Sequence, residues 1–277
     1  MNKNYPLSFI NEGAQIADNV EIQPFVTIQD NVVIGEGTWI GSHVTIMSGT
    51  RIGKNSRIFP GAIVGSVPQD LKFQGEDSTL EIGDNVTIRE YCTINRGTRA
   101  NGKTVIGDNT LIMAYVHVAH DCVIGRNCVL ANNVNLAGHI EIGVFTTLGG
   151  LVAVHQFVKI GSHVMVGGGS LVGKDIPPYI KAARYPLAYA GVNSVGLRRR
   201  GYSATVINQI QEIYRYFYVR GYNTRQAIQH IEAEVPFTEE RDIILQFIRE
   251  STRGVVKSPR LNGSKFKDLP VKIYDED

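Results

Sequence analysis

IQDNVVIGEGTWIGSHVTI, residues 28–46, repeats one pattern every six residues. Isoleucine occupies positions 28, 34, 40 and 46, and glycine often follows it, as at Gly35 and Gly41. A small or β-branched residue stands four positions after each of the first three isoleucines, at Val32, Thr38 and Val44. A period of six excludes an amphipathic helix, whose apolar residues recur at three and four. It indicates strands of about four residues joined by tight corners.

The same period extends along most of the chain. In steps of six from Ile10 to Val172, 25 of 28 positions are aliphatic, and the exceptions are Asp70, Glu76 and Ala100. A buried unpaired charge costs several kcal/mol. We therefore expect residues 66–79 to leave the repeat as a loop, and residues 96–103 to do the same. Loops on a rigid scaffold are frequent carriers of function.

Composition narrows the class of protein. The net charge is +2, which gives no strong field for nucleic acid, and no apolar stretch is long enough for a transmembrane segment. No signal peptide is recognisable at the start of the sequence, so we expect a cytoplasmic protein. The three cysteines all fall on the small-residue position of the repeat, which predicts buried fillers rather than a disulfide or metal site. They are Cys92, Cys122 and Cys128.

The period stops near Pro177 and Pro178, and a helical pattern follows. A first helix is predicted from a Ser203 cap to Gly221, a second from Thr224 to Pro236, and a third after a Thr238 cap. We expect the tail from residue 256 to be loosely held. The predicted domains are 1–185, mainly β, and 186–277, a small C-terminal α-helical domain.

The six-residue repeat resembles that of the hexapeptide-repeat proteins, which fold as a left-handed parallel β-helix with three hexads per coil. The resemblance implies about nine coils, a prism on the order of 45 Å tall at ~4.8 Å per coil. With 18 residues per coil, His120 lies beneath Gly138, which lies beneath Gln156. A histidine beside a glycine amide pairs a base with a backbone donor.

A narrower resemblance rests on motifs spread over nearly the whole chain. The chain resembles the acyl-carrier-protein-dependent UDP-N-acetylglucosamine acyltransferases, which begin lipid A synthesis. The motifs are QDLK (69–72), INRGT (94–98), HVAHDC (117–122), LANNVNLAGH (130–139), AVHQF (153–157), HVMVGG (163–168), GVN (191–193), RRG (199–201) and STRG (251–254).

The resemblance implies a role for each of several residues. His120 is the general base, Asp121 orients or charge-balances it, and the Gly138 amide meets the oxyanion. The positions expected around the glucosamine and phosphates are Asp70, Lys72, His117, His139 and Gln156. Those expected on the nucleotide side are His155, Asn193 and Arg199. Gly168 is expected to limit acyl-chain length, and glycine there leaves room for a long 3-hydroxyacyl chain.

The resemblance also implies partners. The acyl chain would pass from acyl carrier protein to the 3-position of UDP-N-acetylglucosamine, in a site between subunits of a homotrimer with the 66–79 loop reaching across. No resident cofactor or metal is expected, because phosphopantetheine arrives on the carrier protein. Whether the acceptor carries a 3-hydroxyl or a 3-amino group stays open.

Three alternatives remain beside this interpretation. A γ-class carbonic anhydrase shares the prism, and His117, His120 and His139 could be imagined around zinc. The N-acyltransferase that acts later in the same pathway has an additional domain before its repeats. A non-catalytic β-helix scaffold presents regular faces and needs no charged loops such as the one that holds Asp70.

Overall fold

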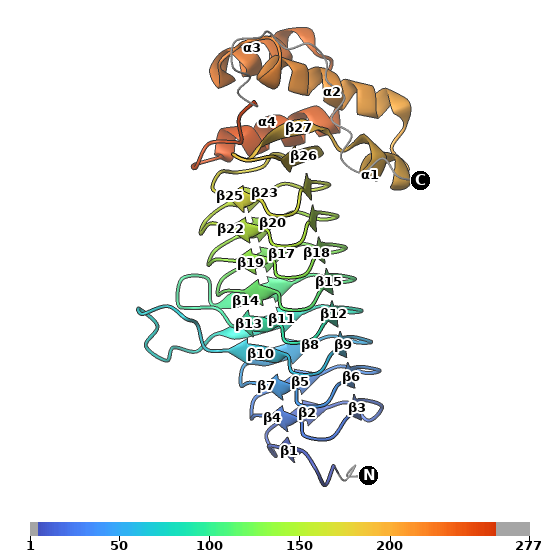
Figure 1. Cartoon of the computed structure of the whole chain (residues 1–277), viewed down its shortest axis with the longest axis vertical. Coiled ribbons are helices and arrows are strands. Elements are labelled where there is room, and N and C mark those ends of the chain that lie inside the picture. Colours follow the sequence, from blue (N-terminus) through green and yellow to red (C-terminus); the bar gives the residue numbers. More distant parts are fainter. Residues whose placement is uncertain (1–4, 259–277) are drawn as a thin grey trace.

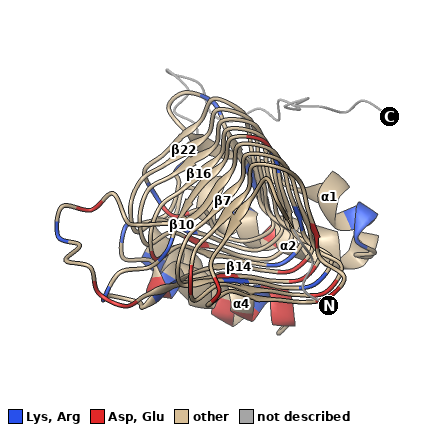
Figure 2. Ribbon diagram, turned by 90° about the horizontal axis from the view of Figure 1, so that it is seen from below, with Lys and Arg blue, Asp and Glu red and all other residues tan. Residues whose placement is uncertain are grey.

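Each hexad folds into one short strand, and three strands complete a triangular coil (Figures 1 and 2). The computed structural model describes residues 5–258. Most strands are two residues long and the longest in the prism have four. They are therefore shorter than expected, because the tight corners take up the remaining residues of each hexad.

The three faces of the prism are three parallel sheets. Sheet A contains β1 (Phe9–Ile10), β4 (Thr27–Ile28), β7 (Thr45–Ile46), β10 (Ile63–Ser66), β13 (Thr93–Asn95), β16 (His117–Val118), β19 (Asn135–Leu136), β22 (Ala153–Val154) and β25 (Leu171–Val172). Sheet B contains β2 (Gln15–Ile16), β5 (Val33–Ile34), β8 (Thr50–Ile52), β11 (Thr79–Ile82), β14 (Lys103–Ile106), β17 (Val123–Ile124), β20 (Glu141–Ile142) and β23 (Lys159–Ile160). Sheet C contains β3 (Glu21–Ile22), β6 (Trp39–Ile40), β9 (Arg57–Ile58), β12 (Thr87–Ile88), β15 (Leu111–Ile112), β18 (Val129–Leu130), β21 (Thr147–Leu148), β24 (Met165–Val166), β26 (Ile180–Ala183) and β27 (Ala188–Val192).

The repeat positions stack one above another inside the prism. Ile94 pairs with Val118, and Val118 pairs with Leu136 on the next coil. All three side chains are fully buried. The three cysteines are also buried and free, as predicted, and burial raises the pKa of the Cys122 thiol to about 12. They are fillers of the core.

Both predicted excursions are present. The chain leaves the prism between β10 and β11, over residues 67–78, and again between β13 and β14, over residues 96–102. Figure 2 shows the larger loop projecting from one edge of the triangle. Asp70 and Glu76 therefore never enter the core, as their charge requires.

In the described part of the chain, four helices follow the prism and lie across its end (Figure 1). They are α1 (Ser194–Arg199), α2 (Ala204–Tyr218), α3 (Thr224–Glu234) and α4 (Glu239–Glu250). Ser203 and Thr238 cap α2 and α4 as predicted, and Asn223 caps α3. Helix α1 and the antiparallel hairpin β26–β27 were not predicted. The proposed boundary at 185/186 falls inside the turn of that hairpin.

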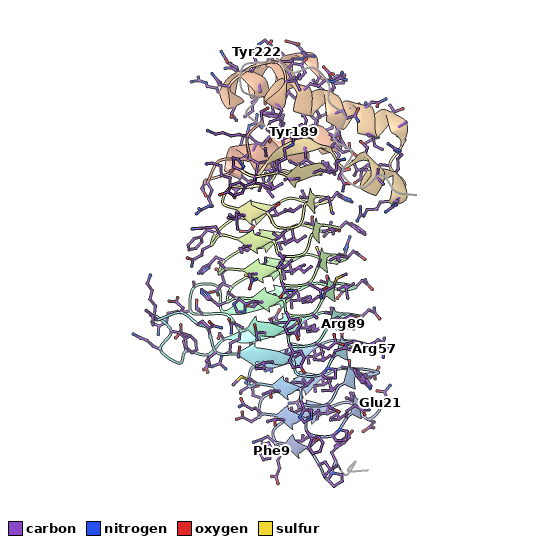
Figure 3. All side chains as sticks on the ribbon, viewed as in Figure 1. Phe9, Glu21, Arg57, Arg89, Tyr189 and Tyr222 are labelled. Atoms are coloured by element: carbon purple, nitrogen blue, oxygen red, sulfur yellow. The ribbon has the colours of Figure 1, made fainter. Side chains whose placement is uncertain are left out.

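Aromatic and polar contacts join the helices to the prism. Tyr189 of β27 stacks on Tyr218 of α2, with ring centroids 4.1 Å apart (Figure 3). The expectation of a loose tail is wrong for residues 256–258, because Val256 is buried and its amide donates to the Asp175 carbonyl at 2.9 Å. Residues 259–277 lie outside the described part of the chain. Within residues 5–258, every helix is too short or too polar to cross a bilayer.

Candidate functional site

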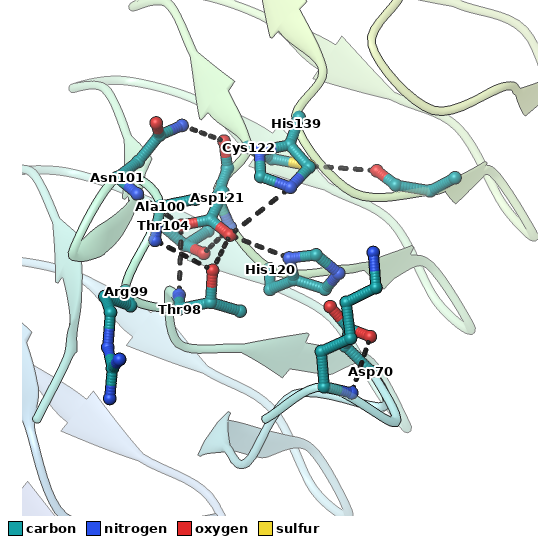
Figure 4. A network of polar contacts seen from close by, with 12 residues as sticks. Asp70, Thr98, Arg99, Ala100, Asn101, Thr104, His120, Asp121, Cys122 and His139 are labelled. Carbon is teal, nitrogen blue, oxygen red and sulfur yellow. Dashed lines mark hydrogen bonds and ion pairs between the residues drawn. The ribbon is translucent and has the colours of Figure 1, made fainter. Parts of the chain in front are cut away.

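His120 and Asp121 form a buried pair at the corner between β16 and β17 (Figure 4). Adjacent side chains on a strand point to opposite faces, but Asp121 has φ 60°, so the chain turns at this residue. His120 Nδ1 lies 2.7 Å from Asp121 Oδ2, and the two residues are 7% and 1% exposed. The ionised carboxylate can only accept, so Nδ1 carries the proton and Nε2 keeps its lone pair.

The Asp121 carboxylate is held from the 96–102 excursion as well as by His120. Thr98 N and Oγ1 donate to its two oxygens at 3.0 and 2.7 Å. Burial by itself would raise the pKa of Asp121, but the hydrogen bonds from Thr98 and His120 outweigh it and the pKa is lowered. The carboxylate is therefore charged at neutral pH and available to balance a protonated His120.

Gly138 lies one coil above His120, as the 18-residue spacing predicted. A Cβ at Gly138 would stand 2.7 Å from His120 Nε2 and 2.6 Å from Cε1, so only glycine lets the imidazole lie here. Among residues 5–258, none accepts a hydrogen bond from the Gly138 amide. The imidazole of His120, a candidate base, therefore lies next to Gly138, whose backbone N–H is free to donate.

His139 completes this corner of the prism. Its ring lies edge-on to His120 with centroids 5.0 Å apart and stacks on Phe157 at 4.6 Å. His139 Nε2 is 3.7 Å from Asp121 Oδ2. Burial lowers the pKa of His139 despite the nearby carboxylate, so it is neutral at pH 7.

The ligand atoms of His120, Asp121 and His139 lie within 4.8 Å of one another, which is close enough for a metal ion. Both Asp121 oxygens, however, already accept hydrogen bonds from Thr98, and a cation would have to displace donors. His117 does not join this group, since its Nδ1 is bonded to Thr93 Oγ1 at 2.8 Å. The three-histidine zinc set of the carbonic anhydrase alternative is therefore not assembled.

A cavity of about 380 Å³ lies between the 67–78 loop and this corner. Four predicted sugar and phosphate positions line it: Asp70, Lys72, His139 and Gln156. Thr98 and Arg99 close it from the second excursion. The loop thus already lies against its own chain's corner. His155 is exposed beside Gln156, with its Nδ1 3.1 Å from the Gln156 carbonyl oxygen.

A second cavity, of about 430 Å³, lies between sheet C and α1. Asn193 and Arg199, predicted for the nucleotide side, line it together with Lys181 and Arg200. Asn193 also caps α1, and its Nδ2 donates to the His163 carbonyl at 2.9 Å. The 67–78 loop and α1 lie on opposite sides of the prism (Figure 2), so one chain does not bring Asn193 and Arg199 to the loop cavity, whereas His155 lies beside Gln156.

Gly168 lies in the exposed turn between β24 and β25. A Cβ there would stand 3.0 Å from the Gly150 carbonyl oxygen, so a side chain fits only tightly. The residue that sequence reasoning missed is Thr98. It lies inside the INRGT motif, but nothing in the motif indicates that its donors face Asp121.

Three comparisons place this fold and site among known proteins. The profile of the family described as UDP N-acetylglucosamine O-acyltransferase, domain 2, matches residues 175–256, and the hexapeptide-repeat profile matches 31–66 and 103–138. The acyl-(acyl-carrier-protein)–UDP-N-acetylglucosamine O-acyltransferase of Sulfurihydrogenibium sp. is 55% identical over 91% of this chain and 93% of its own. That of Trichlorobacter lovleyi is 52% identical over 90% and 97%.

Solved structures agree with the sequence relatives. The UDP-N-acetylglucosamine acyltransferase of Bacteroides fragilis superposes with a TM-score of 0.90 at 50% identity, covering 92% of this chain and 100% of that one. The enzyme of Acinetobacter baumannii gives a TM-score of 0.88 at 42% identity, covering 91% and 98%. The fold is thus the left-handed parallel β-helix that the resemblance to hexapeptide-repeat proteins implied, followed by a small helical part.

Proposed function

This chain belongs to the family of acyl-(acyl-carrier-protein)–UDP-N-acetylglucosamine O-acyltransferases, and we propose that it performs their reaction with His120 as general base. It is an acyltransferase whose substrates are an acyl carrier protein thioester and UDP-N-acetylglucosamine. The transferred group is a 3-hydroxyacyl chain, the acceptor atom is the 3-hydroxyl oxygen, and the product enters lipid A synthesis.

The observation that carries the mechanism is the His120–Asp121 pair beneath Gly138. His120 Nε2 takes the proton of the sugar hydroxyl as its oxygen attacks the thioester carbonyl carbon. Asp121 balances the charge of the imidazolium, and the Gly138 amide donates to the oxyanion. When the intermediate collapses, the carbon–sulfur bond breaks and the proton passes from His120 to the leaving thiolate.

Substrate binding is divided between the two cavities. Lys72 offers a cation to the diphosphate, and Asp70 and Gln156 offer hydrogen bonds to the sugar. His139 lies at the corner, His117 lies on strand β16 three residues before His120, and His155 stands beside Gln156. Asn193 and Arg199, from the second cavity, bind the nucleotide side. Gly168 sets the room for the acyl chain.

A homotrimer would join these separated groups. The two cavities lie on opposite sides of one chain, so a neighbouring copy can bring its α1 cavity to this chain's loop cavity. Exposed apolar corner side chains support such packing along the prism. They are Phe25, Tyr91, Tyr115 and Leu151. Three unpaired cysteines fit a reducing compartment, and we place the enzyme in the cytoplasm.

No resident cofactor has a part in this scheme, because the acyl group arrives on the phosphopantetheine of the carrier protein. The energetic task of the chain is to orient the hydroxyl and stabilise charge at the reacting carbon. Both tasks fall to residues of the corner around His120.

The assignment is tested with His120→Ala. We expect an oligomer with unchanged melting temperature and a turnover number reduced about 10²- to 10⁴-fold, the usual contribution of a general base. Purified protein would be assayed with a panel of acyl carrier protein thioesters and UDP-sugars. Wild-type turnover in the variant would remove His120 from the mechanism.

A further inference from the structure

Thr98 is a loop residue that is nevertheless buried. It belongs to the 96–102 excursion outside the prism, yet only 7% of it is exposed. A buried hydroxyl needs a hydrogen-bond partner. For Thr98 that partner is the Asp121 carboxylate, 23 residues further along the chain.

The donor and acceptor roles at Thr98 are fixed by its neighbours. The Ala100 amide donates to Thr98 Oγ1 at 3.2 Å, so the hydroxyl proton is left for Asp121 Oδ2 at 2.7 Å. The Thr98 amide donates to Asp121 Oδ1 at 3.0 Å, and the Asn101 amide adds a weaker bond of 3.3 Å to the same oxygen (Figure 4). Both carboxylate oxygens are thereby tied to one loop.

This arrangement limits how the carboxylate can turn. A carboxylate bonded at one oxygen can rotate about its Cβ–Cγ bond, whereas one held at both oxygens cannot. His120 Nδ1 contacts the same Oδ2 that accepts from the Thr98 hydroxyl. The orientation of the imidazole therefore depends on Thr98 through Asp121.

The same excursion also reaches the substrate loop. The Arg99 amide donates to Glu76 Oε1 at 3.1 Å, and Glu76 also accepts from the Gln74 amide at 2.8 Å. The segment from Thr98 to Arg99 thus contacts both the base-orienting carboxylate and the loop that holds Asp70 and Lys72.

We propose that Thr98 is a positioning residue for acyl transfer, which fixes the Asp121 carboxylate and through it the His120 tautomer whose Nε2 faces the acceptor hydroxyl. The proposal rests on His120 acting as the base. Thr98 lines the loop cavity, but its hydroxyl donates to Asp121, so its effect belongs in the turnover number rather than in substrate affinity.

The experiment compares Thr98→Val with Thr98→Ser. Valine keeps the shape and the backbone amide but removes the hydroxyl, while serine restores the hydroxyl. We expect Thr98→Val to lower kcat about 10- to 100-fold, the value of a hydrogen bond to a charged group. The KM for UDP-N-acetylglucosamine should stay unchanged, and Thr98→Ser should recover most of the rate.

Thr110→Val is the matched control. Thr110 is also buried, and its hydroxyl donates to the Gly125 carbonyl at 3.1 Å, away from the site. It should keep wild-type kcat. Thr98→Ala removes the same hydroxyl without putting a methyl group in its place. Thr98→Val and Thr98→Ala should therefore both have a lower kcat, even if one of the two is less stable.

A double-mutant cycle separates positioning from a general structural effect. In an Asp121→Asn background, Thr98→Val should cost little further rate, because the carboxylate it positions is already gone. An equal loss in both backgrounds, or a Thr98→Val enzyme at wild-type kcat, would overturn the role of Thr98. If His120→Ala is inactive while Thr98→Val is fully active, only the Thr98 proposal fails.

Discussion

The middle of the prism and its C-terminal end each contain a buried aspartate and a corner histidine, but they use them differently. Asp121 and Asp175 are both 1% exposed. His139 and His163 adopt φ values of 59° and 60° and each stacks on aromatic rings. The two regions therefore share the type and burial of the aspartate and the backbone shape at the histidine.

The two regions differ in what packs against the corner. In the middle, two loops cover it, and Asp121 faces His120 and His139. At the end, the C-terminal segment and helices cover it: Asp175 accepts from the Lys159 amide at 2.8 Å and from Ser251 Oγ at 2.6 Å. At a different corner of this end, between sheets B and C, His163 Nε2 lies 3.3 Å from Tyr202 Oη. Loops leave a cavity at the corner, whereas the other contacts fasten the end of the prism.

The largest expected effect comes from exchanging the two aspartates for asparagine. Asp121→Asn should lower kcat about 100-fold or more, because the imidazolium loses its counter-charge. Asp175→Asn should leave kcat unchanged and lower the free energy of unfolding by about 1–3 kcal/mol, because a buried hydrogen-bonded group is disturbed. Steady-state kinetics measure the change in kcat, and denaturant melts measure the change in the free energy of unfolding. Similar losses of kcat in Asp121→Asn and Asp175→Asn would contradict the distinction between the two regions.

The second prediction concerns pH and His163. Burial, with a further effect of Arg200, lowers the pKa of His163 from 6.5 to about 4. Below pH 6.5 the imidazole of His163 is protonated in the unfolded chain, whereas in the folded chain it stays neutral until about pH 4. Stability is therefore full above pH 6.5 and falls across that window, by roughly 1–3 kcal/mol.

His163→Phe should remove that part of the pH dependence while keeping the ring stack with Phe145 and Tyr179. Urea midpoints between pH 7.5 and 4.5 measure it. His139→Phe, at the corner between sheets A and B in the middle region, should retain the part that comes from His163. Identical pH curves for wild type and His163→Phe would contradict the expectation.

The smallest effect is expected at Gly168. Gly168→Met should shift donor preference toward shorter acyl chains, roughly tenfold in the ratio of kcat/KM values. Gly173→Met is the control, since a Cβ at Gly173 meets no atom within 4 Å. A shift in Gly168→Met alone would show that the C-terminal end also shapes substrate choice. An unchanged profile would remove Gly168 from the selection of acyl-chain length.

Much of the fold was predictable because the six-residue repeat shows, from residue numbers alone, which side chains lie in the core. It placed Val118 and Leu136 in the core and Asp70 outside it, and both hold in the structure. Helix α1 was missed because it is only six residues long and has no clear apolar stripe. Asn193, which caps it, was predicted only as a nucleotide-side residue and not as a helix cap.

The candidate site was predictable in part for the same reason. Spacing by 18 residues put His120 beside Gly138, and a Cβ at Gly138 would indeed collide with the imidazole. Spacing could not tell that Asn193 and Arg199 lie across the prism from Asp70, since the faces on which loop and helix pack are set by folding.

The sequence by itself determined which residues share a coil and which stack, because a fixed repeat length converts position in the chain into position in space. Only the tertiary structure decided that Asp121 turns toward His120. That orientation depends on a left-handed backbone angle at one corner and on donors from Thr98 in a loop outside the repeat. A loop that leaves the repeat obeys no period, so its contacts are fixed only by packing.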